Sequence, residues 1–123
     1  MEENDWLISP NGQYGLVMQD DGNLVGYDIS VTPWIYFWDT HTHVETDCNS
    51  TYWLVLQDDY NLVLYCYFNG EQRSIWDTST SIVTSGKQAF LEMKNNRNIV
   101  LYGYDQNNTY TQIWSSNTSI SSK

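Results

Sequence analysis

Hydrophobic and polar residues alternate over short stretches of the chain, a period of two that is typical of β-strands. The clearest stretches surround three similar segments, QDDGNLVGY from Gln19, QDDYNLVLY from Gln57 and KNNRNIVLY from Lys94. One set of alternating positions is apolar and is predicted to face a core: Leu16, Met18, Leu24, Gly26, Leu54, Leu56, Leu62, Leu64, Leu91, Met93, Ile99 and Leu101. No stretch combines helical spacing with capping residues, so we predict no helix.

The same unit occurs three times. Trp38, Trp76 and Trp114 are separated by 38 and 38 residues, within the segments FWDTHT, IWDTST and IWSSNT. A small antiparallel sheet with one apolar face cannot bury that face alone, so three such faces should pack around a common axis filled by these tryptophans. The sequence therefore predicts one all-β domain with pseudo-threefold symmetry. The domain covers 1–123 and its repeats cover about 6–42, 43–80 and 81–118.

Each hairpin loop is predicted to contain three residues. A three-residue loop after Gln19, ending at Gly22, sets Gln19 opposite Asn23 and keeps polar and apolar positions on separate faces. The last loop residue should then have a positive φ, which suits Gly22. Tyr60 and Arg97 occupy that place in the other repeats and fit it less well, so those turns should either be strained or differ in geometry.

Composition and charge narrow the choice of partners. The chain has 123 residues and 41% hydrophobic content, enough for one core and too apolar for a disordered chain. Five Lys+Arg against fifteen Asp+Glu give a net charge of −10. That charge should repel phosphate backbones and anionic lipids, so we expect neither nucleic acid nor membrane as a partner. The apolar runs are also too short to span a bilayer.

The start of the chain and its cysteines bear on the compartment. The opening MEENDW has neither a basic nor an apolar signal region, so we expect a cytoplasmic protein if Met1 is native, and secretion stays open. Two cysteines, Cys48 and Cys66, are too few to define a disulfide framework. The predicted register sets Tyr52 opposite Cys66, so a bond would require the preceding segment to fold back. We therefore favour free thiols.

The outward positions of the first two repeats carry the same five residue types, Gln, Asp, Asn, Val and Tyr. Alternate residues of a strand point the same way, so these side chains should converge on one surface. A carboxylate, two amides, a phenol and a small apolar group suit a neutral ligand with closely spaced hydroxyls, namely a sugar. As an alternative, Asp and Asn only shape the turns. The expected binding residues are Gln19, Asp21, Asn23, Val25, Tyr27, Gln57, Asp59, Asn61, Val63 and Tyr65.

The third repeat departs from this pattern. Lys94 replaces Gln and Asn96 replaces Asp, while Asn98, Val100 and Tyr102 match. Lysine cannot accept a hydrogen bond, and a neutral amide accepts more weakly than a carboxylate. We predict a degenerate third site that is weak or silent. Equally, Lys94 could serve only to relieve the acidic surface.

The pattern Q-x-D-x-N-x-V-x-Y, intact from Gln19 to Tyr27 and from Gln57 to Tyr65, resembles the mannose-binding signature of the bulb-type (monocot mannose-binding, snowdrop-agglutinin-like) lectins. The opening LISPNGQYGLVMQDDGNLV and the repeated W-x-[ST]-x-T elements are similar to that family too. The resemblance implies a β-prism II fold of three four-stranded antiparallel sheets, with no metal requirement. It implies mannose-containing glycans or glycoproteins as partners, with the polar motif side chains on mannose hydroxyls and the valine as an apolar contact.

The resemblance also implies two features outside the motifs. In the family the C-terminal strand is commonly exchanged between two subunits, which would place Gln112 to Ser119 at a homodimer contact. The family's usual disulfide begins where this chain has Gly22, so that bridge should be absent. A missing disulfide and a missing leader would both agree with a cytoplasmic protein.

Three rival functions are weighed against the lectin. Asp39, His41, His43 and Glu45 alternate and could share a face as metal ligands, but the segment could equally be a solvated connection, and we predict no bound metal or other cofactor. A glycosidase needs two carboxylates across a cleft, whereas the motif aspartates are sequence neighbours, so we predict no enzyme. The remaining alternative is a β-prism interaction or storage protein that binds no sugar.

Overall fold

The computed structural model describes residues 1–43, 48, 50–81, 88–104, 107 and 109–120. Within them the chain forms β-strands and no helix, as the period of two predicts. The described residues therefore contain no helix long and apolar enough to cross a membrane. The strands are β1 (Trp6–Ile8), β2 (Tyr14–Met18), β3 (Leu24–Asp28), β4 (Ile35–Asp39), β5 (Ser50–Leu56), β6 (Leu62–Phe68), β7 (Glu71–Asp77), β8 (Ala89–Met93), β9 (Ile99–Tyr104) and β10 (Tyr110–Ser115).

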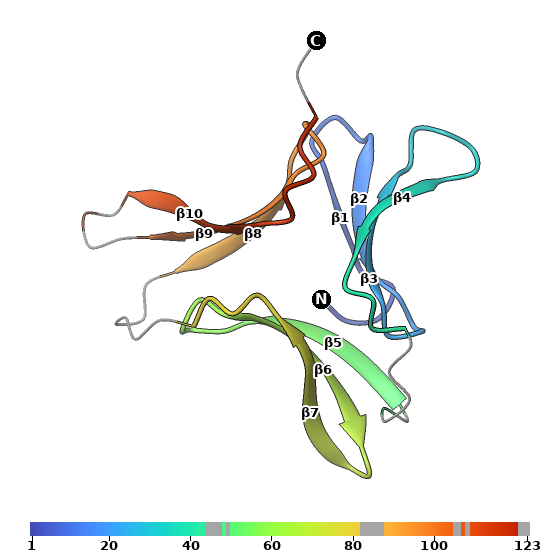
Figure 1. Ribbon diagram of the computed structural model, residues 1–123, viewed down its shortest axis with the longest axis vertical. Helices are drawn as coiled ribbons and strands as arrows, with labels where there is room; N and C mark the ends of the chain where they lie inside the picture. The colour runs from blue at the N-terminus through green and yellow to red at the C-terminus, as the bar shows by residue number, and fades with distance from the viewer. Residues whose placement is uncertain (44–47, 49, 82–87, 105–106, 108, 121–123) are drawn as a thin grey trace.

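The strands form three antiparallel sheets, one for each repeat. The sheet orders are β1-β2-β3-β4, β5-β6-β7 and β10-β9-β8. Figure 1 shows the three sheets arranged around a common centre, like the walls of a prism. The prediction of an all-β prism is confirmed. Of the expected four strands per sheet, the described residues show four in the first sheet and three in each of the others.

The N-terminal residues lie along the free edge of the second sheet. Glu2 forms an isolated antiparallel bridge with Trp53 of β5. The Met1 ammonium donates to the carbonyl oxygen of Leu54 at 2.9 Å, and the Leu54 amide donates to the Met1 carbonyl at 2.8 Å. An edge strand exposes unpaired backbone groups, and these contacts satisfy part of that edge.

The apolar faces of the sheets meet in one core. All the predicted inward residues belong to the buried cluster except Gly26, Leu56 and Leu91, and the two leucines pack against it. The rings of Trp38, Trp76 and Trp114 form a nearly equilateral triangle, with centroids 5.8, 5.7 and 5.9 Å apart and edge-to-face contacts. These are favourable spacings for aromatic pairs. The repeats therefore pack around a common axis, with one tryptophan from each.

The hairpin loops have the predicted three residues. The Gln19 amide donates to the Asn23 carbonyl at 2.9 Å, and Gly22 has a φ of 90°. Tyr60 and Arg97 have φ values of 73° and 75°, so the three turns share one left-handed geometry. Of the two alternatives, a different geometry is therefore wrong. These two residues adopt a conformation that costs energy for a side chain with a Cβ.

Contacts between neighbouring sheets explain why that cost is tolerated. Each left-handed loop residue lies against the next sheet around the prism. A Cβ added at Gly22 would lie 2.6 Å from the Tyr52 ring, so glycine is required there. The contacts in the other two loops are the Tyr60 hydroxyl donating to the Tyr104 carbonyl at 2.6 Å, and the Arg97 guanidinium 5.6 Å from the centre of the Phe37 ring.

The cysteines form a disulfide, which corrects our preference for free thiols. Tyr52 does pair with Cys66, as predicted, but a β-bulge lies between Ser50 and Tyr52. Thr51 has a φ of 49° in this bulge. The preceding segment is thereby redirected, and the Cα atoms of Cys48 and Cys66 lie 5.8 Å apart. Disulfides persist mainly in oxidising compartments, so the cysteines no longer favour a cytoplasmic location.

Candidate functional site

The first motif lies on the β2–β3 hairpin. The Gln19 side-chain amide donates to the Tyr27 hydroxyl oxygen at 2.6 Å. Asp21 Oδ1 accepts the Asn23 backbone N–H at 2.9 Å, closing an Asx turn within the loop. The strand residues and the loop carboxylate are thus held by separate bonds. The bond between Gln19 and Tyr27 leaves the amide carbonyl oxygen and the phenolic hydrogen available to a ligand.

Asn23 has a structural role other than the turn shaping that the sequence offered as an alternative. Its side-chain N–H donates to Asp39 Oδ2 at 2.9 Å, and its Oδ1 accepts from Thr40 Oγ1 at 3.1 Å and from the Thr42 amide at 3.2 Å. These bonds tie the start of β3 to the last residue of β4 and to the segment after it. The residue is only 6% exposed, and its own chain uses both acceptor positions and one of its two donors. We call these side-chain contacts of the motif asparagine the bracket. The recurring W-x-[ST]-x-T element, which supplies the hydroxyl residues of the bracket, was its signal in the sequence.

An open hollow of about 300 Å³ contains three of the five predicted residues of the first site. Asn23 and Val25 do not line it, and Val25 is 3% exposed. The lining residues are Asn4, Trp6, Val17, Gln19, Asp20, Asp21, Tyr27 and Trp34.

Two tryptophans that the sequence analysis missed form an aromatic wall of this hollow. Trp6 belongs to β1 and Trp34 precedes β4. Their ring centroids lie 5.3 Å apart, and 6.3 and 5.7 Å respectively from that of Tyr27. The sequence held a signal, because it contains six tryptophans and the repeat accounts for three.

The second motif repeats these hydrogen bonds on the β5–β6 hairpin. The Gln57 amide donates to the Tyr65 hydroxyl oxygen. Asp59 Oδ1 accepts the Asn61 amide at 3.0 Å, and Oδ2 accepts the Ser81 hydroxyl at 2.6 Å. The bond from Ser81 and then that from the Asn61 backbone lower the pKa of Asp59. The carboxylate is therefore kept ionised, but Ser81 already occupies one of its acceptor positions.

The second motif has the same bracket and a buried valine. The Asn61 side chain donates to Asp77 Oδ2 at 3.3 Å and accepts from Thr78 Oγ1 at 3.2 Å and the Thr80 amide at 3.3 Å. Val63 is 3% exposed, like its counterpart in the first motif. In both motifs the asparagine and the valine are built into the fold, while the glutamine, aspartate and tyrosine are more accessible.

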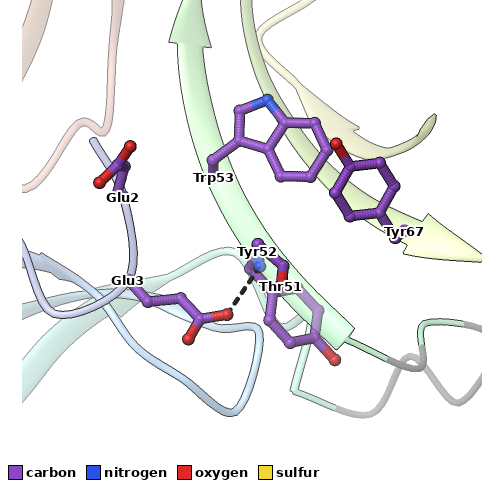
Figure 2. Close-up of a pocket in the computed structure, with 6 residues that line it drawn as sticks. All are labelled: Glu2, Glu3, Thr51, Tyr52, Trp53 and Tyr67. Atoms are coloured by element: carbon purple, nitrogen blue, oxygen red, sulfur yellow. Dashed lines mark hydrogen bonds between the residues drawn. The ribbon is translucent and has the colours of Figure 1, made fainter. Parts of the chain in front are cut away.

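A second hollow of about 520 Å³ is lined by none of the five predicted residues of the second motif, but it adjoins the motif through Trp53. Its Trp53 ring stacks on Tyr65 with centroids 5.7 Å apart and contacts Tyr67 at 4.9 Å. Figure 2 shows the Trp53 and Tyr67 rings together, with Glu3 reaching the Tyr52 amide at 2.8 Å. The hollow thus combines aromatic faces with carboxylates. It is lined by Glu2, Glu3, Thr51, Tyr52, Trp53 and Tyr67.

The third motif keeps the framework but changes its chemistry. Lys94 Nζ donates to the Tyr102 hydroxyl oxygen at 3.1 Å, and this bond raises the lysine pKa. Asn96 Oδ1 accepts the Asn98 amide at 3.0 Å, so it closes the same Asx turn as the aspartates. Val100 is 1% exposed. A cation therefore stands where the other motifs present an amide, and a neutral amide where they present a carboxylate.

The histidine segment brings part of the sequence-predicted cluster together. One ligand atom from each of Asp39, His41 and His43 lies within 4.8 Å of the others. Glu45 lies outside the described residues.

Comparisons with known proteins concern the fold. No family model and no curated protein matches the chain. Among solved structures the chain is similar to the Japanese Marasmius oreades lectin, with 24% identity over 96% of this chain and 84% of that one, and a TM-score of 0.68. The chain has a lectin fold. It is also similar to a domain-swapped lectin dimer from Mycobacterium smegmatis, with 32% identity, coverage of 94% and 91%, and a TM-score of 0.44, which is too low to show a shared fold.

Within this lectin fold the C-terminal strand completes its own sheet. β10 pairs with β9 of the same chain, from Tyr110 opposite Tyr104 to Ser115 opposite Val100. Trp114 on this strand belongs to the central triangle. An exchanged dimer would make the same contacts between two chains, so exchange of this strand stays a prediction.

Proposed function

We propose that the protein is a lectin that binds mannose and mannose-rich glycans at its two intact motifs. The observation that carries the proposal is the repeated arrangement of a glutamine bonded to a tyrosine hydroxyl beside a loop carboxylate, once in each of two sheets. The resemblance to the bulb-type lectins and the lectin fold support it. The sugar contacts in this proposal need no metal.

The first motif offers a complementary set of groups to a sugar. Asp21 Oδ2 has no hydrogen-bond partner in the described part of the chain, and it can accept from a sugar hydroxyl. Gln19 can accept through its carbonyl oxygen, and Tyr27 can donate through its hydroxyl. Bonds to an ionised acceptor are the stronger ones, so Asp21 should contribute most. Trp6 and Trp34 can pack against the apolar face of the ring.

The second motif should hold a monosaccharide less tightly. Asp59 Oδ2 already accepts from Ser81, so a sugar hydroxyl must share or displace that bond. Trp53 and Tyr67 beside the motif offer compensating contact area to a longer glycan. A shallow site for one sugar ring corresponds to roughly millimolar affinity, about −4 kcal/mol. Useful avidity would then require both sites or an oligomer.

The same contacts argue against catalysis in this proposal. Each motif aspartate closes a turn through one oxygen, and Asp59 also holds Ser81. The two acidic residues that line the first hollow, Asp20 and Asp21, come from one loop. A glycosidase instead places two carboxylates on opposite sides of the scissile bond. We therefore propose a binding protein.

A mannose titration followed by amide NMR tests the proposal. Wild-type protein should show two sets of shifted signals, one around each intact motif. Asp21→Asn and Asp59→Asn should each weaken one set at least fivefold, because a neutral amide replaces the charged acceptor. The fold should survive, since Asn96 closes the same turn in the third motif. Asp58→Asn is the matched control, an exposed charge next to the second site that should change little.

The alternative function, an interaction or storage protein, predicts a different result in this experiment. An interaction or storage protein would show no signal shifts at tens of millimolar mannose and no response on a glycan array. Shifts that persist unchanged in the Asp21→Asn, Asp59→Asn double variant would show that the sugar binds elsewhere on the chain.

A further inference from the structure

The turn after the last strand of each sheet has one conformation in all three repeats. His41, Ser79 and Asn117 occupy equivalent positions and have φ values of 58°, 55° and 56°. This left-handed residue follows the strand-end side chain by two positions. The turn brings the two side chains together, as the second and third repeats show. Ser79 Oγ donates to Asp77 Oδ1 at 3.0 Å, and Ser115 Oγ donates to Asn117 Oδ1 at 2.9 Å.

In the first repeat the same turn carries an imidazole. His41 stands where the second repeat has a serine, and the strand-end residue is Asp39. His43 packs edge-to-face against the His41 ring, with centroids 5.1 Å apart. One ligand atom of each of the three residues lies within 4.8 Å of the others. The turn geometry thus brings together three potential metal-ligand groups, which in the sequence are recognisable only as alternating residues.

The two imidazoles are accessible, and the Asp39 carboxylate is held in position by a hydrogen bond. His41 and His43 are exposed, and neither imidazole makes a hydrogen bond within the described residues. The Asp39 carboxylate accepts from the Asn23 side chain at 2.9 Å through Oδ2. Such a bond orients a carboxylate ligand and leaves its other oxygen available.

We propose that Asp39, His41 and His43 form a binding site for one divalent transition-metal ion. Two imidazole nitrogens and one carboxylate oxygen suit Zn²⁺, Ni²⁺ and Cu²⁺, whereas Mg²⁺ and Ca²⁺ prefer sites built from oxygen alone. Three protein ligands leave a position open to water or to a further ligand, as in many zinc sites. The proposal does not rest on sugar binding, because none of the three residues lines either hollow.

Calorimetry with ZnCl₂ on untagged, chelator-treated protein tests the site. One ion should bind per chain, and MgCl₂ and CaCl₂ should give no binding heat. His41→Ser, which installs the residue of the second repeat, and His43→Ala should each weaken zinc binding at least tenfold. Asp77→Asn changes the matching carboxylate of the second repeat and should leave zinc affinity unchanged.

Histidine NMR supplies an independent readout. The chain contains two histidines, both in this cluster, so the imidazole signals report on no other site. Both imidazoles should shift in step with zinc up to one equivalent. The proposal is overturned if no stoichiometric zinc binding occurs below 1 mM, or if binding persists in the His41→Ser and His43→Ala variants. Because both residues are exposed, circular dichroism should show each variant folded.

Discussion

Replacing Asn98 by alanine separates the structural part of the motif from its binding part. The third motif has lost the glutamine and the aspartate but keeps this asparagine. Asn98 Oδ1 accepts from Ser116 Oγ at 3.2 Å and from the Thr118 amide at 3.3 Å, which are the bracket contacts of the other repeats. If the bracket holds each hairpin to the segment that follows the last strand of its sheet, the asparagine is required even where no sugar binds.

The magnitude follows from which groups lose a partner. Ser116 Oγ keeps a bond to Thr118 Oγ1 at 2.7 Å, so the loss falls mainly on the Thr118 amide. One lost bond with a partly buried donor left unpaired costs about 1–2 kcal/mol. For a domain of this size that lowers Tm by roughly 4–10 °C.

Thermal unfolding followed by circular dichroism measures the effect. Asn98→Asp is the matched control, because a carboxylate keeps an acceptor for both contacts, and it should unfold close to wild type. Mannose affinity at the first two motifs should be unchanged in both variants. An Asn98→Ala protein that unfolds within 1 °C of wild type would refute the bracket, and retention of this asparagine would then need another explanation.

Three further predictions concern the third motif, the Ser81–Asp59 hydrogen bond and the disulfide. Lys94→Gln with Asn96→Asp should raise the number of mannose sites from two to three in an NMR titration, because the third framework is intact; a count of two would contradict this. Ser81→Ala should raise the Asp59 pKa toward its ordinary value and strengthen sugar binding at the second motif, as measured by carboxyl NMR against pH and by mannose titration. A lowered folded-state pKa stabilises the fold above the unfolded-state pKa, and that contribution is lost as the pH falls through the folded-state value. The Ser81→Ala variant should therefore be less stable than wild type near neutral pH and equally stable in acid. Reducing the disulfide should lower the free energy of unfolding by about 3 kcal/mol, given its separation of 18 residues, and urea unfolding with and without reductant measures this.

The fold could be predicted from the sequence because local rules decide most of it. A period of two, repeated at a spacing of 38 residues, predicted the strands and the inward residues. Keeping each face of the hairpin chemically uniform predicted the three-residue loop before Asn23, which the structure confirms. In both cases the determinant lies within a single repeat.

The features that the sequence analysis missed depend on contacts between distant segments. Tyr60 adopts the left-handed turn because its hydroxyl reaches Tyr104 in the neighbouring sheet. The bulge at Thr51, which allows the disulfide, leaves no pattern in the alternation of residues. Trp6 and Trp34 lie together beside the first motif because β1 and β4, which Trp34 directly precedes, belong to the same sheet as the motif hairpin.

The site was predicted in part for the same reason. The row from Gln19 to Tyr27 lies on one hairpin, so its convergence could be read from strand geometry. The bracket around Asn23 could not, because its partners Asp39 and Thr42 lie at the end of β4 and beyond it.

The most direct test of the account is a co-crystal structure with a mannobiose. We expect density at the first two motifs, with Asp21 and Asp59 accepting from sugar hydroxyls and the Lys94 position empty. Density confined to another surface, or no density under conditions in which the sugar saturates the protein in solution, would contradict the central claim that these repeated rows of side chains bind sugar.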